Sequence, residues 1–284
     1  MKNIGVNTKL IAIIGTDVAH SKSPAMMNAA FTKKKLDYYF FPMNVIEEDF
    51  GTVVKGVSKM NFAGLTITIP YKLEIIKYLD KIDHLAEIIG AVNTVKIEDG
   101  KLRGFNTDGE GFVRGLEADR DVNVVENTFF IVGAGGVSRA ITTVLASRKP
   151  KKIYLANRTF EKAKEICDKV NREVYGCCIP LPLNENIKSY AGQATILINT
   201  TNIGMPPFDG QTPIDPSLLK KNMLVADVIY KPRKTKMLEE AEKRGCRIIN
   251  GQSLLLHQGK IAFNIWTDLE APGEVMADAV FGKE

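Results

Sequence analysis

Two short stretches in the first part of the chain carry polar side chains suited to a small anionic substrate. In AHSKSPAM, Ser21 and Ser23 stand just ahead of a predicted helix, where hydroxyls and free backbone amides can hold a carboxylate. In GLTITIPYK, a predicted strand carries Thr68 toward its end, Pro70 stops it, and Lys72 follows. A third polar residue, Asp108, lies further along the chain in FNTDGEGF.

Each of these residues also has a plainer interpretation. Ser23 could be an ordinary helix N-cap, and Asp108 could cap the helix predicted after it. Lys72 could be a surface charge that follows a strand. The residues alone leave these alternatives open.

A glycine-rich loop between a predicted strand and a predicted helix indicates a dinucleotide site. In FFIVGAGGVSRA, Gly133 permits the tight turn, and Gly135 lets the backbone approach a pyrophosphate at the helix N-terminus. Ser138 replaces the third glycine of the usual fingerprint and is small enough for close packing. The alternative is a strand–turn–helix junction that needs glycine only for its geometry.

The end of the next predicted strand indicates which dinucleotide is bound. LANRTFEK places Asn157, Arg158, Thr159 and, one helical turn on, Lys162 where NAD-binding folds commonly have a carboxylate. That carboxylate would repel a 2′-phosphate, whereas the guanidinium of Arg158 offers a planar fork of donors to it. A solvated basic loop is the alternative. Together with the glycine loop, the pattern predicts NADP as the cofactor.

Length and composition narrow the class of protein. The chain has 284 residues, of which 45% are hydrophobic and 25% charged, as in an ordinary globular protein of one large or two medium domains. Its formal net charge of +5 comes from 38 basic and 33 acidic residues spread along the chain. Nucleic-acid binders usually cluster their bases, so we predict no nucleic-acid partner.

Cysteine, histidine and apolar patterns give three further expectations. The four cysteines show no CxxC spacing and the three histidines no ligand spacing, so we expect no metal site. Reduced thiols are the default in the cytoplasm, where we place the protein. No apolar run approaches the roughly 20 residues of a membrane helix, so we predict no membrane partner.

The predicted elements that position these residues alternate between strands and helices. A strand is expected over 10–15, a helix over 23–35, and a hairpin turn at Asp99-Gly100. A second alternating series begins near 128, and the segment SLLLHQGKIAFNIWTDL is an apolar helix with no strand after it. This order predicts an α/β protein with largely parallel sheets.

We therefore expect two domains. Residues 1–108 together with 249–284 would form an α/β substrate-binding and catalytic domain. Residues 109–248 would form a Rossmann-type, doubly wound NADP-binding domain. The C-terminal helices would return to pack on the first domain.

The chain resembles the shikimate dehydrogenase family, which includes the shikimate/quinate dehydrogenases, over nearly its whole length. The resemblance rests on nine motifs in one order: HSKSP (20–24), GLTITIPYK (64–72), GAVNT (90–94), GFNTDG (104–109), GAGG (133–136), NRT (157–159), NTTNIGM (199–205), DVIYKP (227–232) and LLLHQG (254–259).

The resemblance implies an enzyme of aromatic amino-acid and chorismate biosynthesis that reduces 3-dehydroshikimate to shikimate with NADPH. It implies a catalytic pair, Lys72 and Asp108. The implied substrate ligands are Ser21, Ser23, Thr68, Lys72, Asn93, Asp108, Tyr230 and Gln258. The implied cofactor ligands are Gly133, Ala134, Gly135, Gly136, Val137, Asn157, Arg158, Thr159, Lys162, Thr200, Met205 and Gly251.

Ketone chemistry agrees with these implied roles. Hydride addition develops negative charge on the ketone oxygen, and a nearby cation or proton donor lowers the barrier. Lys72 can act there as an ammonium, with Asp108 keeping it charged and accepting a hydrogen bond from a substrate hydroxyl.

Two departures from the family pattern leave the substrate open. Thr66 stands where the family often has Asn, and Ser253-Leu254 where it often has Gly-Met. A quinate or quinate/shikimate dehydrogenase is therefore an alternative, and a non-catalytic NADP-binding protein is a more distant one. The sequence is compatible with a monomer or a homodimer.

Overall fold

The computed structural model describes residues 4–184 and 187–282 of the chain. It divides into two compact units, one of Met1–Thr107 with Gln258–Glu284 and one of Asp108–His257. The chain passes from the first unit to the second at Asp108. It returns to the first unit between His257 and Gln258, which lies inside a helix and not at residue 249 as expected from the sequence. The assignment of the two units to substrate and cofactor stays a prediction.

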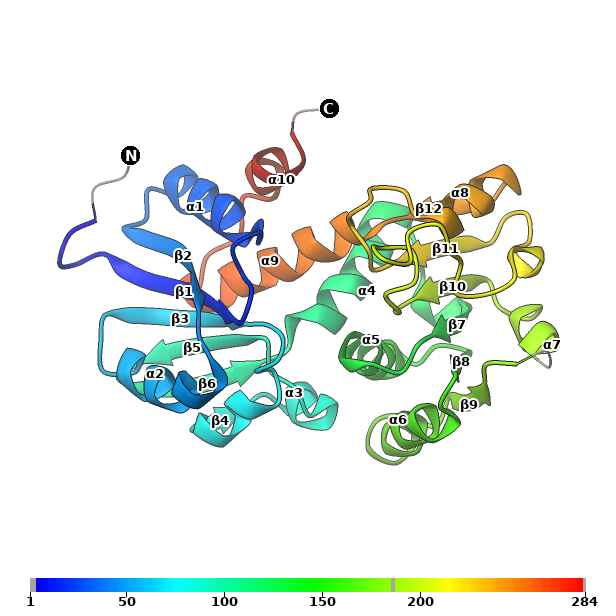
Figure 1. Cartoon of the computed structure of the whole chain (residues 1–284), viewed down its shortest axis with the longest axis horizontal. Helices are drawn as coiled ribbons and strands as arrows, with labels where there is room; N and C mark the ends of the chain where they lie inside the picture. Colours follow the sequence, from blue (N-terminus) through cyan, green and yellow to red (C-terminus); the bar gives the residue numbers. More distant parts are fainter. Residues whose placement is uncertain (1–3, 185–186, 283–284) are drawn as a thin grey trace. The chain divides into compact units, whose positions relative to one another are not determined.

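The first unit is built on a mixed six-stranded sheet of order β2-β1-β3-β5-β6-β4 (Figure 1). Strands β1, β2 and β3 are parallel, β5 runs antiparallel to β3, and β6 runs antiparallel to β5. Its elements up to Phe105 are β1 (Lys9–Gly15), α1 (Ser23–Lys33), β2 (Tyr38–Asn44), the 3-10 helix Glu47–Asp49, α2 (Phe50–Val57), β3 (Phe62–Ile67), the 3-10 helix Glu74–Tyr78, β4 (Lys81–Ile82), α3 (His84–Ile89), β5 (Thr94–Glu98) and β6 (Lys101–Phe105).

Local sequence signals account for two features of this unit. The hairpin expected at Asp99-Gly100 joins β5 to β6, with positive φ at both residues (52° and 73°), as a two-residue turn of this type requires. Helix α1 carries Pro24 in its first turn, where the absent N–H breaks no hydrogen bond. Both expectations are confirmed.

The second unit contains a wholly parallel six-stranded sheet of order β12-β11-β10-β7-β8-β9 (Figure 1). Counted along this unit, the order is 6-5-4-1-2-3, which is the doubly wound Rossmann arrangement. Its elements are α4 (Thr107–Arg120), the 3-10 helix Val124–Glu126, β7 (Thr128–Val132), α5 (Gly136–Ser147), β8 (Lys152–Asn157), α6 (Phe160–Glu173), β9 (Cys178–Pro182), α7 (Lys188–Ala191), β10 (Ile196–Asn199), the 3-10 helix Pro216–Leu218, β11 (Leu224–Asp227), α8 (Lys236–Lys243) and β12 (Arg247–Ile249).

The burial of these strands explains their sequences. The four residues of β10 and the four of β11 are all buried, so each strand has a run of three apolar residues without polar alternation before its polar last residue. Strand β9 contains Pro180 and Pro182, which an edge strand tolerates because one side of it needs no donors.

The last two helices are α9 (Gly251–Thr267) and α10 (Gly273–Phe281). The chain returns to the first unit within α9, and α10 packs along α1 (Figure 1). Trp266 of α9 is 3% exposed, and its indole N–H donates to the Val95 carbonyl of β5 at 2.9 Å. The predicted return of the C-terminal helices is confirmed.

Gly64 in β3 makes room for this indole. A Cβ at position 64 would overlap both Trp266 Nε1 and the Val95 carbonyl oxygen. We expect Gly64→Ala to lower the free energy of unfolding by about 1–3 kcal/mol, the usual cost of overpacking a core.

Urea denaturation followed by circular dichroism measures this loss. Gly56→Ala in α2 is the matched control, because the nearest atom to a Cβ there is 3.9 Å away. Since alanine is the better helix former, the control should leave stability unchanged or raise it by up to about 1 kcal/mol. Equal stability of Gly64→Ala and the unmodified protein would contradict the packing argument.

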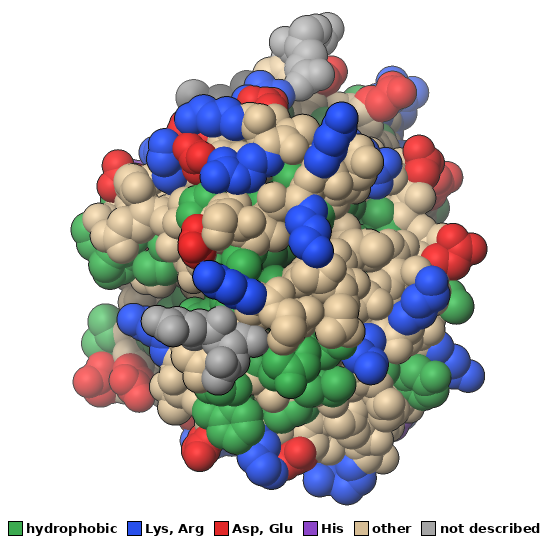
Figure 2. All heavy atoms as spheres, turned by 90° about the vertical axis from the view of Figure 1, so that its right-hand side faces the viewer, with side chains coloured by type: hydrophobic (Ala, Val, Ile, Leu, Met, Phe, Trp, Pro, Cys, Tyr) green, Lys and Arg blue, Asp and Glu red, His purple; other side chains and the backbone are tan. Residues whose placement is uncertain are grey.

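One face of the molecule shows basic side chains scattered among acidic and uncharged ones (Figure 2). This agrees with the even spread of charge along the sequence. Within the part of the chain that the structure describes, no helix combines the length and apolar character needed to cross a membrane.

Candidate functional site

The predicted substrate residues of the first unit converge on one edge of its sheet. Strands β1 and β3 are parallel, so Ser21, which follows β1, and Thr68, which follows β3, leave the sheet at the same edge. Strand β5 runs the opposite way, so Asn93, which precedes it, starts at that edge as well. Two backbone hydrogen bonds hold these chain segments together at this point: Thr68 N donates to Ile14 O at 3.0 Å, and Ile67 N donates to Asn93 O at 2.8 Å.

Ser21 and Ser23 lie at the start of α1, but not as an N-cap pair. Ser23 is the first residue of the helix and is 7% exposed, and Lys22 occupies the cap position without a side-chain bond. Ser21 Oγ accepts from the Ser23 amide at 3.2 Å. The ordinary N-cap interpretation of Ser23 is therefore wrong.

Asn93 belongs to a buried polar network that fixes its orientation. Its Oδ1 accepts from the Thr107 amide at 2.8 Å and from Thr94 Oγ1 at 3.0 Å, and its Nδ2 donates to Thr107 Oγ1 at 3.1 Å. Thr107 Oγ1 also lies 3.4 Å from Gln258 Oε1 in α9. Two predicted ligands, Asn93 and Gln258, thus share one hydroxyl. Thr94 and Thr107 were missed from the sequence, where only their places in the GAVNT and GFNTDG motifs could have indicated them.

The remaining predicted substrate and catalytic residues lie near element ends. Lys72 is half-buried beyond β3, and its carbonyl accepts from the Val92 amide at 2.8 Å. Asp108 is half-buried in the first turn of α4, inside the helix and not at its N-cap. It is the first residue of the second unit, and Tyr230, 37% exposed, follows β11 in that unit.

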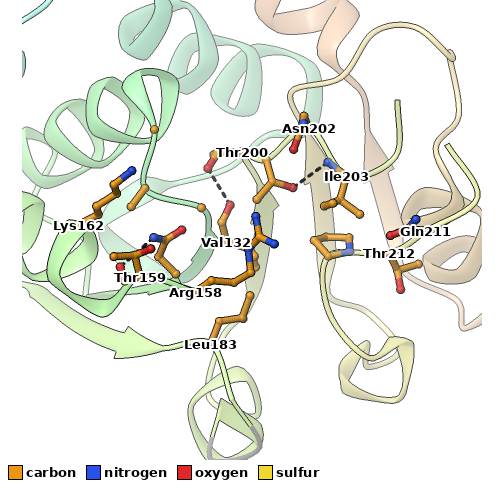
Figure 3. A pocket seen from close by; sticks show the side chains of 16 residues that line it. Val132, Arg158, Thr159, Lys162, Leu183, Thr200, Asn202, Ile203, Gln211 and Thr212 are labelled. Atoms are coloured by element: carbon orange, nitrogen blue, oxygen red, sulfur yellow. Dashed lines mark hydrogen bonds between the residues drawn. The ribbon is translucent and has the colours of Figure 1, made fainter. Parts of the chain in front are cut away.

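A pocket of about 410 Å³ opens at the carboxyl ends of the strands in the second unit (Figure 3). It lies between β7, β8 and β10, where the strand order reverses and doubly wound folds bind their ligands. Its lining residues are Val132, Gly133, Ala134, Gly135, Asn157, Arg158, Thr159, Lys162, Leu183, Thr200, Thr201, Asn202, Ile203, Gln211, Thr212 and Pro213.

The glycine loop of this pocket fits a pyrophosphate. Gly133 has φ of 107°, and a Cβ there would come within 2.7 Å of Thr200 Oγ1, so only glycine is accommodated. Gly135 caps α5 without any side-chain bond, and a Cβ on it would meet nothing within 4 Å. Space is therefore open beside Gly135 at the N-terminus of α5, and a helix N-terminus attracts an anion. Ser138 is fully buried and donates to Gly133 O at 2.6 Å, which agrees with its expected close packing.

The end of β8 supplies the basic part of the pocket. Arg158 extends from the strand end into the pocket, and Lys162 lies on the first turn of α6 (Figure 3). Asn157 Nδ2 donates to Thr159 O at 2.9 Å, which holds the turn between strand and helix. Asp and Glu are missing from the set of residues that line this pocket. The donor set suits a 2′-phosphate.

The far wall of the pocket was largely missed from the sequence. Thr200 was expected, and its hydroxyl donates to Val132 O at 2.7 Å. Thr201, Asn202 and Ile203 follow it, and only their place in the NTTNIGM motif could have indicated them. Segment 211–213 also lines the wall and carries no recognisable pattern.

Four residues predicted as cofactor ligands are not part of this lining: Gly136, Val137, Met205 and Gly251. Gly251 begins α9, and a Cβ on it would overlap the Val228 carbonyl oxygen, so close packing already requires glycine there. Met205 is 40% exposed. Contact of these four residues with a cofactor stays a prediction.

The three histidines differ in their exposure. His20 and His84 are exposed, whereas His257 is 6% exposed and its Nε2 lies 3.2 Å from Asp119 Oδ1. Burial would raise the pKa of Asp119, but hydrogen bonds from His257 and Ser253 hold it below its ordinary value. Over residues 4–184 and 187–282, no three His, Cys, Asp or Glu side chains are grouped to hold a metal ion.

Comparison with known families gives two matches. Residues 13–95 match the family described as shikimate dehydrogenase substrate binding domain. Residues 117–236 match the family described as shikimate / quinate 5-dehydrogenase.

Individual proteins are similar over nearly the full chain. A shikimate dehydrogenase (NADP(+)) of Alkaliphilus oremlandii is 40% identical, covering 96% of each chain. A shikimate 5-dehydrogenase of Listeria monocytogenes, solved with shikimate and NAD, is 36% identical with a TM-score of 0.94 and covers 99% of each chain. A shikimate dehydrogenase solved with NADP⁺ is 40% identical with a TM-score of 0.89, covering 98% of this chain and 96% of its own.

Proposed function

The chain belongs to the shikimate dehydrogenase family, and we propose that it reduces 3-dehydroshikimate to shikimate with NADPH. The observation that carries this proposal is the near full-length similarity to an NADP⁺-dependent shikimate dehydrogenase. The basic pocket at the end of β8, whose lining holds no carboxylate, supports the choice of cofactor. The product places the enzyme in aromatic amino-acid and chorismate biosynthesis.

The proposed cofactor site uses the residues of the second unit. The glycine loop and the N-terminus of α5 would hold the pyrophosphate, and Arg158 with Lys162 would hold the 2′-phosphate. When bound, NADPH supplies the hydride that converts the ketone into an alcohol.

In the first unit, the proposed substrate ligands lie where β1 and β3 end and β5 begins. The Ser21 and Ser23 hydroxyls and Tyr230 would bind the carboxylate, as neutral donors that also let an anionic product leave. The ring hydroxyls would be bound by Thr68, Asn93 and Gln258. Hydrogen bonds to Thr107 hold the side chains of Asn93 and Gln258 in place for this role.

Lys72 and Asp108 would perform the proton chemistry. As hydride arrives, negative charge develops on the ketone oxygen, and the Lys72 ammonium would stabilise that oxygen and protonate it. Asp108 would act as the partner of Lys72 in the catalytic pair and accept a hydrogen bond from a substrate hydroxyl. A non-catalytic NADP-binding protein would have no need to keep both residues.

The test of this function is a steady-state assay of the purified protein with 3-dehydroshikimate and NADPH, following absorbance of the reduced cofactor. We expect saturable turnover that depends on both compounds. NADP⁺ binding without any turnover would instead support the non-catalytic alternative.

The substrate preference is a separate prediction. We expect kcat/KM for shikimate to exceed that for quinate by roughly ten- to hundredfold. Quinate carries an additional hydroxyl at the carbon that bears the carboxylate, and Ser21, Ser23 and Tyr230 offer it no dedicated partner. A buried hydroxyl without a partner costs about 1–3 kcal/mol.

Parallel oxidation assays of shikimate and quinate with NADP⁺ and NAD⁺ measure this preference. Thr66 is half-buried in β3 opposite Thr94 of β5 and is the residue most able to change it. A quinate efficiency equal to that of shikimate would favour the quinate/shikimate alternative. A Thr66→Asn variant would then show whether this position sets the choice.

A further inference from the structure

A buried carboxylate, Asp227, lies directly behind the wall of the cofactor pocket. It ends β11, is 1% exposed, and does not line the pocket. Three donors converge on its two oxygens: the Ile229 amide reaches Oδ1 at 3.0 Å, Thr235 Oγ1 reaches Oδ2 at 2.7 Å, and Asn199 Nδ2 lies 3.2 and 3.3 Å from the two.

Strand register brings Asp227 and Asn199 together. They are paired residues at the ends of the adjacent parallel strands β10 and β11, so their side chains lie on the same face of the sheet. Both are almost fully buried, as is Thr235. The network is therefore closed to water.

Asn199 links Asp227 to the pocket wall through hydrogen bonds. Its Oδ1 accepts from the Thr201 amide at 3.0 Å and from Thr201 Oγ1 at 2.7 Å, and its Nδ2 donates to Ile203 O at 3.0 Å. The Ile203 amide in turn donates to Thr201 Oγ1 at 3.1 Å. Thr201 and Ile203 line the pocket, so one chain of bonds runs from Asp227 to the surface that a cofactor would touch.

An amide cannot replace this carboxylate without a conflict. If the NH₂ of an asparagine at 227 took the Oδ1 position, it would face both the Ile229 amide and the Asn199 NH₂. If it took the Oδ2 position, the Thr235 hydroxyl could rotate to accept from it, but the Asn199 NH₂ would still lie opposite it. A donor left without an acceptor in a buried network is costly, so the wall would shift to relieve the conflict.

The negative charge of the Asp227 carboxylate lowers the stability of the folded protein. Burial raises the pKa of Asp227 to about 6, although bonds from Ile229, Thr235 and Asn199 lower it. Because the pKa lies above the ordinary value of 3.8, ionisation of Asp227 makes folding less favourable as the pH rises between the two.

We propose that Asp227 is a positioning residue for the NADP pocket, which acts through Asn199 to hold the wall at Thr201–Ile203 in its binding conformation. The proposal rests on the proposed function and names a residue that determines how well its cofactor binds. Asp227 acts as the carboxylate, so its effect depends on pH.

The groups that face Asp227 are uncharged. They come from β10 (Asn199), from the segment after β11 (the Ile229 amide) and from the start of α8 (Thr235). The shift in the pKa of Asp227 comes from its burial and from the hydrogen bonds that these three groups donate. The pH dependence therefore belongs to Asp227 itself.

Calorimetric titration of NADP⁺ into the full-length protein tests the proposal, because it needs no substrate. At pH 8 we expect Asp227→Asn to raise the Kd for NADP⁺ about tenfold. The matched control is Glu240→Gln, which removes a surface carboxylate of α8 that pairs with Lys236, Lys243 and Arg244 and should leave the Kd unchanged.

The pH profile separates positioning from a structural role. As the pH falls through about 6, Asp227 of the unmodified protein becomes protonated, and the ratio of the two Kd values should shrink toward one. Titration of the 2′-phosphate affects both proteins equally and leaves this ratio unchanged. A Kd for Asp227→Asn equal to that of the unmodified protein at pH 8, or a ratio that stays constant with pH, overturns the proposal.

Two further outcomes are distinguishable. If circular dichroism shows Asp227→Asn to be unfolded, the Thr235→Val variant tests the proposal instead, because it removes one donor but keeps the carboxylate. This variant should raise the Kd for NADP⁺ two- to fivefold. An unchanged Kd would refute the positioning role of Asp227. If the unmodified protein does not bind NADP⁺ at all, the proposed function fails, and not merely the role of Asp227.

Discussion

Lys72→Ala is expected to lower kcat by about 10²–10⁴-fold while the Kd for shikimate changes only modestly. The ammonium of Lys72 would act mainly on charge that develops on the substrate oxygen in the transition state. The loss of such an interaction appears in kcat more than in binding. Steady-state kinetics and equilibrium binding of shikimate measure the two effects separately.

Lys77→Ala is the matched control for this variant. Lys77 lies in the 3-10 helix after Lys72, is exposed and pairs with Glu74, so its removal should leave kcat unchanged. Asp108→Asn should also lower kcat, and the double variant should lose much less than the product of the two single losses, because the residues would act as a unit. Near-normal turnover of Lys72→Ala would return this residue to the surface-charge interpretation.

Arg158→Ala is expected to lower kcat/KM for NADPH by about 10- to 150-fold and to change kcat/KM for NADH far less. A well-formed charged hydrogen bond to phosphate contributes roughly 1.5–3 kcal/mol, and only NADPH carries the 2′-phosphate. The unmodified protein should correspondingly prefer NADPH. Initial rates with each reduced cofactor at saturating 3-dehydroshikimate give both ratios.

Arg172→Ala provides the control for a lost cation. Arg172 lies in the last turn of α6, pairs with Glu173 and is not among the residues that line the pocket, so both efficiencies should be unchanged. If the unmodified protein used NADPH and NADH with equal efficiency, the assignment of Arg158 to the 2′-phosphate would be wrong.

The fold could be predicted from the sequence largely because its signals are local. Apolar runs over 10–15 and 128–132, the Asp99-Gly100 turn and Pro24 in a first helical turn each act within a few residues. The short strands β4, β9 and β12 gave no such signal, since two or three residues, or a run with two prolines, do not resemble a strand.

The cofactor pocket was partly predictable for the same reason. The glycine loop is one continuous stretch, and Asn157, Arg158, Thr159 and Lys162 lie within one strand end and one helical turn. The opposite wall is made by segments 200–203 and 211–213, which are more than 60 residues from the glycine loop. They join it because β10 pairs with β7, and no local pattern specifies that pairing.

The sequence by itself determined the α/β class, the family, the glycine loop and the basic strand end, because each depends on neighbouring residues. The tertiary structure alone decided which polar side chains meet. Asn93 reaches Thr107 because β5 and β6 are antiparallel neighbours, and Asp227 reaches Asn199 because β10 and β11 are adjacent and in register. Hydrogen bonds between distant residues depend on strand order and register, which the core of the whole domain fixes.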